Sequence, residues 1–251
     1  MLVSEYAEPK QRPAARKYEL DETYFDTIGP AQAYWLGYLL ADGNVALRKR
    51  DGVVRQFVLQ AASKDGEHLE KLRAAVGAGH PLYGPHKGVW QFAVPSYRLC
   101  AAAEKYGVVP NKSLTAEPPV LPDRLYWHWL RGLIDGDGSF NRYYRPSRAV
   151  KHNGRGRPAT HGRDVLMLAV VGSASVTAKL YADFGGSWRS QANVWRWSIN
   201  DRRAADILTG VYAGSEPATR LDRKYELAVR LGLVTEDDGG RPAMERRILK
   251  S

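Results

Sequence analysis

The sequence is short of the features that mark several common protein classes. Its 251 residues include a single cysteine, Cys100, so the chain can form neither an internal disulfide nor a cysteine-rich zinc site. Its longest apolar runs, such as residues 165–171, are far too short to cross a bilayer. The opening residues, MLVSEYAEPKQRP, contain no apolar segment of a secretory signal. We therefore expect a cytoplasmic or organellar protein that is neither secreted nor in a membrane.

Several catalytic and cofactor-binding signatures are also missing. No Walker loop or dinucleotide fingerprint occurs, and no His-Asp pair marks a serine nucleophile. The closing residues, ERRILKS, lack the His-Asn pair of an intein. A zinc or histidine-metal nuclease is also disfavoured, because its histidines would be closely spaced. No such spacing occurs among His80, His86, His128, His152 and His161.

Positive charge is in clear excess. The chain carries 37 Lys and Arg against 27 Asp and Glu, a net charge of +10. Residues 1–118 have a net charge of +2 and residues 119–251 a net charge of +8. A chain this basic most often binds nucleic acid or an acidic surface, and a charged surface that serves only solubility is the alternative.

One order of elements occurs twice along the chain. Apolar periodicity and turn residues predict α-β-β-α-β-β-α in each half, without copied sequence. In the first half we expect helices at 31–42, 63–77 and 97–106, and strands at 45–50, 53–62, 81–84 and 89–95. Gly43 is expected in a left-handed conformation after the first helix, Asp51-Gly52 as a hairpin turn, and Ser63 as the N-cap of the second helix.

The second half repeats this order with an additional helix. Helices are expected at 125–137, at 173–185 after Ser173 or Ser175, at 201–213 and at 219–231, and strands at 139–144, 164–173, 187–190 and 194–200. The predicted organisation is an N-terminal arm at 1–26, a first repeat at 27–118, a second repeat at 119–234 with a basic insertion at 145–163, and a C-terminal tail at 235–251.

Two segments stand at equivalent places in the repeats. They are WLGYLLADG at 35–43 and LRGLIDGDG at 130–138, and both have Gly third, Asp eighth and Gly ninth. Small residues four apart form a smooth stripe on a helix face. The packing residues expected in the two stripes are Gly37, Ala41, Gly132 and Gly136. Glycine inside a helix costs about 1 kcal/mol relative to alanine, and close packing of the two helices would offset that cost.

Side-by-side packing would bring together Asp42 and Asp137, which end the two helices. Two carboxylates at close range repel each other unless a cation lies between them. The arrangement therefore predicts a divalent metal, most simply Mg²⁺, held by carboxylates, water and phosphate oxygens. The alternative is a plain Asp-Gly turn after each helix.

These two segments resemble the paired signature of LAGLIDADG homing endonucleases in their monomeric, two-repeat form. The resemblance covers about residues 18–232. It implies an α+β fold in which two pseudo-symmetric αββαββα repeats pack through the two motif helices and the antiparallel sheets form a DNA-binding saddle. Trp35 replaces a small aliphatic residue, Leu40 stands where the second motif has Asp135, and Arg131 would need a partner if it is buried near the helix packing. Since that position varies in the family, Asp135 is not expected to bind metal.

The resemblance also implies a mechanism. Asp42 and Asp137 match the metal-binding acids, with the backbone of Ala41 and Gly136 as further candidate ligands for two or three shared Mg²⁺ or Mn²⁺ ions. Lys112 and Lys224 match the basic group that assists near each scissile phosphate. The ions would activate water and stabilise the leaving 3′ oxygen. The family cuts both strands across the minor groove and leaves short 3′ overhangs.

Polar side chains on the strands are candidates for DNA contacts. Those expected on the outer faces are Arg48, Arg50, Arg55, Gln60 and Gln91 in the first half, and Asn141, Tyr143, Arg189, Gln191 and Arg196 in the second. A solvated strand face is the alternative for each. The insertion 145–163 has five Arg, one Lys and no acid, and contributes Arg145, Arg148, Lys151, Arg155 and Arg157 as expected phosphate contacts. The alternative is a basic loop without a ligand.

The sequence thus predicts a site-specific endonuclease that works as a monomer on double-stranded DNA, with no obligate protein partner. Its target would be asymmetric and about two helical turns long. The alternative is a binder that does not cut, either an intron RNA maturase that recognises structured RNA or a DNA-binding regulator.

Overall fold

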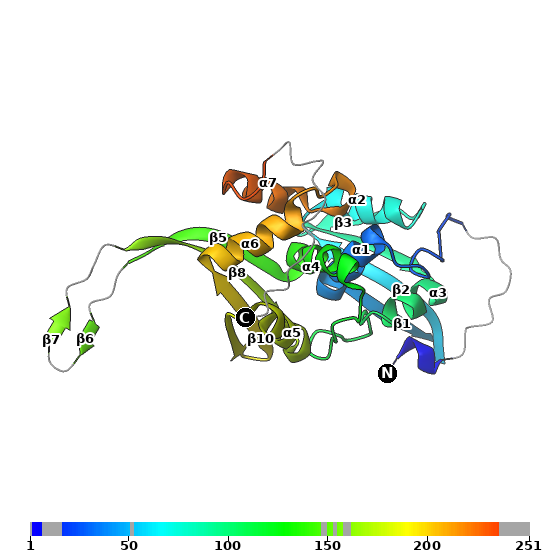
Figure 1. The fold of residues 1–251 in the computed structure, drawn as a ribbon. Coiled ribbons are helices and arrows are strands. Elements are labelled where there is room, and N and C mark those ends of the chain that lie inside the picture. The colour runs from blue at the N-terminus through cyan, green and yellow to red at the C-terminus, as the bar shows by residue number, and fades with distance from the viewer. Residues whose placement is uncertain are drawn as a thin grey trace.

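A computed structural model describes residues 2–6, 17–50, 53–146, 150–152, 155–157 and 162–235 (Figure 1). The side chains of Arg55 and of residues 150–152 and 155–157 are not described. Several sequence predictions therefore lie outside what the structure describes: the Asp51-Gly52 turn, the contacts by Arg55 and Arg148, the N-terminal arm at 7–16, and the tail beyond Thr235.

The first half contains the predicted seven elements in the predicted order. They are α1 (Pro30–Asp42), β1 (Gly43–Arg50), β2 (Val53–Ser63), α2 (Gly66–Ala75), β3 (Tyr83–His86), β4 (Val89–Pro95) and α3 (Tyr97–Glu104), preceded by a short 3-10 helix, η1 (Val3–Glu5). Its strands form one antiparallel sheet in the order β1-β2-β4-β3.

The second half repeats this order around an inserted hairpin. Its elements are α4 (Asp123–Asp137), β5 (Gly138–Arg145), β6 (Val150–His152), β7 (Arg155–Arg157), β8 (Arg163–Gly172), α5 (Ala174–Phe184), β9 (Ser187–Gln191), β10 (Val194–Asn200), α6 (Asp201–Tyr212), η2 (Pro217–Thr219) and α7 (Asp222–Arg230). The main sheet has the order β5-β8-β10-β9, which is equivalent to that of the first half. The predicted α+β fold of two pseudo-symmetric repeats is confirmed.

Helices α1 and α4 pack side by side at the centre of the molecule, between the two sheets (Figure 1). A Cβ atom added to Gly37 would lie 2.0 Å from the carbonyl oxygen of Trp129, and one added to Gly132 would lie 2.0 Å from that of Tyr34. The two backbones therefore touch, and only glycine fits at these positions. Farther along, a Cβ on Gly136 would lie 2.3 Å from the Cβ of Ala41.

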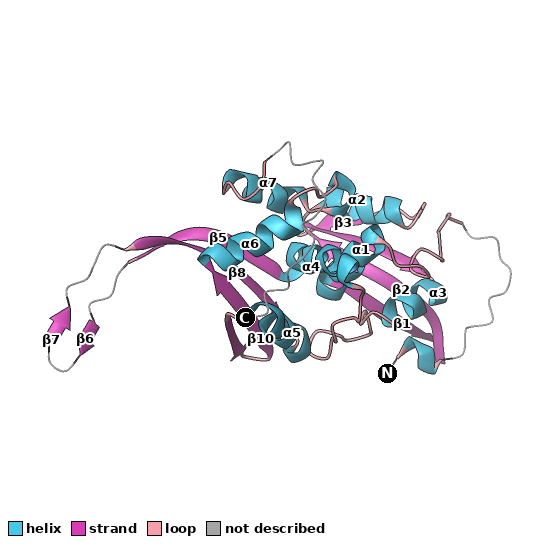
Figure 2. Cartoon of the chain, viewed as in Figure 1, coloured by secondary structure: helices cyan, strands magenta, loops and turns pink. Residues whose placement is uncertain are grey.

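Each sheet turns one face toward the helices and a shared core. Alternate residues of the first sheet, such as Phe57, Leu59, Phe92 and Val94, are buried in that core. Leu168, Trp197 and Ile199 do the same in the second sheet. Strands β5 and β8 run on as a long two-stranded arm away from the body (Figure 2). Among the described residues, no helix has the length and apolar character needed to span a membrane.

Two local predictions are wrong. Gly43 is extended, with φ −85° and ψ 168°, and not left-handed. Glycine is required there because a Cβ would lie 2.5 Å from the carbonyl oxygen of Leu39. The N-cap of α2 is Asp65 and not Ser63, because β2 extends through Ser63. By contrast, Ser173 caps α5, with its hydroxyl accepting a hydrogen bond from the backbone N–H of Val176.

Candidate metal centre and nucleic-acid interface

The central helices α1 and α4 each end in an acidic residue, Asp42 and Asp137. Burial raises the pKa of Asp42, and the nearby Lys224 and Lys112 oppose that rise. The pKa of Asp137 is raised to about 6, first because surrounding protein displaces water and second because Asp42 adds negative charge. The negative charge of Asp42 therefore acts on Asp137 and disfavours its ionised form.

Both predicted lysines lie at this end of the helices, and both are buried. Lys112 is 5% exposed, and its ammonium donates a hydrogen bond to the carbonyl of Ala41 at 2.9 Å. Lys224 is 7% exposed and donates to the carbonyls of Ile134, Asp135 and Gly138 at 2.6, 2.8 and 2.7 Å. A cation at a helix C-terminus satisfies unpaired carbonyls and opposes the helix dipole.

Burial lowers the pKa of both lysines. The pKa of Lys224 falls to about 8, although Asp135 opposes the shift. The pKa of Lys112 is lowered less strongly, with Asp137 and Asp42 opposing the effect of burial. The acids and lysines therefore act on one another electrostatically, and they form one cluster of opposite charges where the two helices end.

Asp135 differs sharply from Asp137, two residues later in α4. It is 2% exposed and accepts hydrogen bonds from the hydroxyls of Tyr34 and Tyr212 and from the backbone N–H of Leu221, at 2.7–2.8 Å. The Tyr34 hydroxyl also meets the Nε2 atom of His68 at 3.0 Å. The carboxylate thus joins both repeats within the core.

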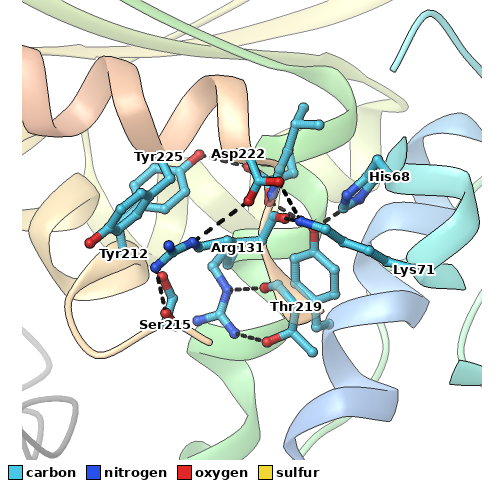
Figure 3. A network of polar contacts seen from close by, with 12 residues as sticks. His68, Lys71, Arg131, Tyr212, Ser215, Thr219, Asp222 and Tyr225 are labelled. Carbon is cyan, nitrogen blue, oxygen red and sulfur yellow. Dashed lines mark hydrogen bonds and ion pairs between the residues drawn. The ribbon is translucent and has the colours of Figure 1, made fainter. Parts of the chain in front are cut away.

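Arg131 has the buried partners that the sequence required. Its guanidinium donates to the carbonyls of Thr219 and Val211, at 2.7 and 3.0 Å, and to the Thr219 hydroxyl at 3.2 Å. Figure 3 shows its contacts with Thr219 beside the ion pair of Lys71 and Asp222, which ties α2 to α7 at 2.7 Å. The bonds of Arg131 stay within the second repeat, and the Lys71–Asp222 ion pair holds the second repeat against the first.

The outer face of the first sheet carries most of the predicted polar side chains. Paired strand residues share a face, and the register pairs Arg48 with Gln56 and Asn44 with Gln60. Gln91 pairs with Tyr83, which is 56% exposed. Arg50 lies beyond an irregularity after Arg48 and pairs with Val53 on the same outer side.

A groove of about 610 Å³ follows this outer face. It is lined by polar side chains from β1, β2 and β4 and also by Lys17, Tyr18 and His80. The Tyr18 and His80 rings lie 5.0 Å apart, and the Gly79 N–H donates to the Glu19 carbonyl at 2.9 Å. The end of the N-terminal arm therefore belongs to the wall of the groove.

The predicted residues of the second sheet also share its outer face. Asn141 pairs with Met167, and Met167 pairs with Asn200. Arg196 pairs with both Val171 and Arg189, and Gln191 pairs with Val194. Tyr143 and Arg145 continue this face along β5, opposite Val165 and Arg163. Each sheet thus presents a row of arginine, asparagine or glutamine side chains away from the core.

The basic insertion contains a short antiparallel hairpin. Lys151, Arg155 and Arg157 lie on β6 and β7, with Lys151 paired to Gly156 and His152 paired to Arg155. Their predicted phosphate contacts remain predictions, because only the backbone is described at these positions.

Several residues at the site were not predicted from the sequence. Gln56 is four residues before Gln60 on an extended strand, so strand alternation alone places both on one face. Lys17 and Tyr18 gave no such signal, because their place depends on packing against the loop after α2. Tyr38 was also missed, although it lies one helical turn before Asp42.

Comparison with known proteins supports the fold without close sequence likeness. No protein-family model and no curated protein matches the chain. The chain is structurally similar to the LAGLIDADG meganuclease I-AabMI bound to uncleaved DNA, with a TM-score of 0.54 at 14% identity over 79% of this chain and 87% of that one.

Two further solved structures give the same result. For the I-LtrWI LAGLIDADG homing endonuclease bound to target DNA, the TM-score is 0.53 at 13% identity over 84% of this chain and 90% of that one. For the meganuclease I-SmaMI bound to uncleavable DNA, the values are 0.51 and 14%, over 73% and 80%. The chain therefore has the LAGLIDADG meganuclease fold.

Proposed function

We propose that this protein is a site-specific DNA endonuclease that cuts both strands of a long, asymmetric target and leaves short 3′ overhangs. The observation that best supports this proposal is the pair of acids, Asp42 and Asp137, at the adjoining ends of α1 and α4. Each acid directly precedes the first strand, β1 or β5, of a sheet with a polar outer face. The structural neighbours are nucleases bound to DNA, and the net charge of +10 suits the same partner.

The donor set fits Mg²⁺ or Mn²⁺. Among the described residues, no group of three or more His, Cys, Asp or Glu side chains is placed to hold a metal, so water and DNA phosphate oxygens would supply most ligands. The Asp42 and Asp137 carboxylates would hold two or three shared ions, with backbone oxygens of Ala41 and Gly136 as further candidates. Bound ions would supply an activated water and stabilise the leaving 3′ oxygen.

The residues of the chain have separate tasks in this proposal. Asp42 and Asp137 are held rigidly because their helices touch at glycine, which fixes the spacing between the two reacting strands. Each sheet lies along one half of the target in the major groove, and its outer side chains read base edges or contact phosphates. Arg145 and the basic hairpin add phosphate contacts, which raise affinity without selecting sequence.

Cleavage of a randomised duplex library tests the proposal. The wild type with Mg²⁺ is expected to cut a defined set of sequences on both strands. The Asp42→Asn, Asp137→Asn double variant should bind the same sequences and cut none. An Asp206→Asn variant is the matched control, since this half-exposed acid lies on α6, away from the helix ends. It should cut as the wild type does.

Other outcomes would separate the alternatives. Enrichment of a duplex sequence by binding, with no cuts under any divalent metal, would contradict the proposal and leave a DNA-binding regulator. Neither binding nor cutting of duplex DNA, with tight binding of structured intron RNA, would indicate a maturase. Cutting that survives in the double variant would place the chemistry elsewhere on the chain.

A further inference from the structure

The outer face of the first sheet presents a row of side-chain amides. Gln56 and Gln60 lie on β2, and Gln91 of β4 pairs with Ala62, two residues beyond Gln60. Asn44 of β1 pairs with Gln60 and adds another amide to the row. The three glutamines line the groove of about 610 Å³, and within the described residues their amides make no hydrogen bond. These amides are therefore available to a ligand in the groove.

Small apolar side chains lie between the amides. Val58 of β2 and Ala93 of β4 also line the groove, and they pair with Ala46 and Gln60, respectively. Of the described residues that line the groove, none is acidic and Arg48 is the only arginine. The surface of the first sheet therefore offers hydrogen-bond donors, hydrogen-bond acceptors and methyl groups side by side.

The second sheet has arginines at the equivalent place. Strands β10 and β9 correspond to β4 and β3 in the order of the two sheets. Arg196 of β10 pairs with Arg189 of β9, where Gln91 pairs with Tyr83 in the first sheet. Within the described residues, the Arg196 guanidinium has a single hydrogen-bond partner, the weakly accepting sulfur of Met167 at 3.7 Å. Most of its donors are therefore available to a ligand.

Amide and guanidinium groups complement different base edges in the major groove. An amide has both a donor and an acceptor, which match N7 and the N6 amino group of adenine. A guanidinium has donors only, which match the O6 and N7 acceptors of guanine. The methyl group of thymine packs against alanine and other apolar side chains. The two outer faces are therefore suited to different bases.

We propose that the two halves of the DNA target differ in composition. The half on the first sheet is rich in A·T pairs, and the half on the second sheet contains guanines that Arg189 and Arg196 read. This inference rests on the proposed function, in which each sheet lies in the major groove of one half of the target.

The geometry of the first sheet also limits the length of the A·T-rich run. Residues 56–62 of β2 span about 20 Å at about 3.3 Å per residue. That length corresponds to about six base pairs at about 3.4 Å each. Asn44 follows Asp42 by two residues on the chain, so the run should begin toward the centre of the target and extend outward.

Binding selection from a randomised duplex library, without added divalent metal, tests the inference independently of cleavage. One half of the enriched sequence should favour A·T over G·C by about 10-fold at several neighbouring positions. The other half should favour guanine by a similar factor at two positions.

Reciprocal variants assign each half to its sheet. Gln91→Arg should change one preferred base from adenine to guanine in the A·T-rich half and leave the other half unchanged. Arg196→Gln should make the opposite change in the guanine-containing half only. The unchanged half of each selected sequence shows that the variant is folded. Arg202→Gln, which removes an exposed arginine from α6, is the control and should change neither half.

The possible failures can be told apart. A target with A·T and G·C pairs spread equally over both halves would overturn the inference. So would reciprocal variants that change the affinity for all sequences equally, because that result marks contacts to phosphate. A wild type that selects the expected target and cuts it with no divalent metal would overturn the endonuclease proposal and leave the inference standing. Selection of no duplex at all would overturn both.

Discussion

Asp135 and Asp137 are two positions apart in α4, and their carboxylates have opposite surroundings. Asp135 is buried and accepts three hydrogen bonds, whereas the Asp137 side chain reaches solvent beside a second acid. Because a buried carboxylate with three donors has little capacity for another ligand, the first is a structural residue. The exposed acid at the helix end is the one free to bind a cation.

The buried His68 predicts how stability depends on pH. Burial, together with Lys71, lowers the pKa of His68 to about 3, although Asp222 and Asp65 oppose the shift and Lys224 adds to it. The folded protein therefore keeps His68 neutral near pH 5, while the unfolded chain, with a pKa near 6.5, takes up a proton. Lowering the pH from 7 to 5 should therefore decrease the free energy of unfolding by about 2 kcal/mol through this group alone.

His68→Gln isolates that contribution, since glutamine can still donate to Tyr34 and does not titrate. Denaturant unfolding of both proteins at pH 7 and pH 5 measures the difference. The wild type should lose about 2 kcal/mol more than the variant on acidification. Equal losses in the two proteins would contradict a neutral, buried His68.

At the scale of elements, contact between the α1 and α4 backbones predicts the effect of adding a single methyl group. In Gly132→Ala the new Cβ would lie 2.0 Å from the Tyr34 carbonyl oxygen. The helices must therefore separate, and the unfolding free energy should fall by about 3 kcal/mol, at the upper end of the usual cost of overpacking. The alanine's higher helix propensity returns about 1 kcal/mol at most.

Gly210→Ala in α6 is the graded control. Its Cβ would first meet the ring edge of Trp127 at 2.9 Å, a side chain and not a backbone atom. Since that ring can shift, the loss should stay below about 1 kcal/mol. Equal costs for Gly132→Ala and Gly210→Ala in urea unfolding would argue against contact between the central helices.

These elements also show how much of the fold could be predicted from the sequence. Periodicity and paired small residues predicted the order of elements and the central helix pair, because those depend on local patterns. The conformation of Gly43 could not be predicted, because it depends on the Leu39 carbonyl close by. The burial of Lys112 and Lys224 could not be predicted either. It depends on tertiary packing, whereas the resemblance to a family motif identifies only the residue type.

At the scale of the whole molecule, charge and register together predict which arginines bind DNA. Arg48 and Arg196 point from the outer faces of the two sheets. Replacing either one with glutamine should weaken duplex binding about 10-fold and lower the salt slope of log K by about one if the contact is to phosphate. Fluorescence anisotropy across a salt series measures both.

Arg202→Gln is the control for these variants. Arg202 is 94% exposed on α6, which packs on the core-facing side of the second sheet. Its removal takes away the same charge from the helical side of the molecule and should leave affinity within about 2-fold. A loss as large as that of Arg48→Gln would mean that net charge, and not the outer sheet faces, decides binding.

In the proposed function, the two acids at the adjoining ends of α1 and α4 act on the two strands of one DNA duplex. Mapping both cut positions at single-nucleotide resolution on the selected target tests it most directly. Because Asp42 and Asp137 end two helices that pack side by side, we expect cuts that face each other across one minor groove and leave a short 3′ overhang. Cuts that leave 5′ overhangs, or that lie a full helical turn apart, would contradict it.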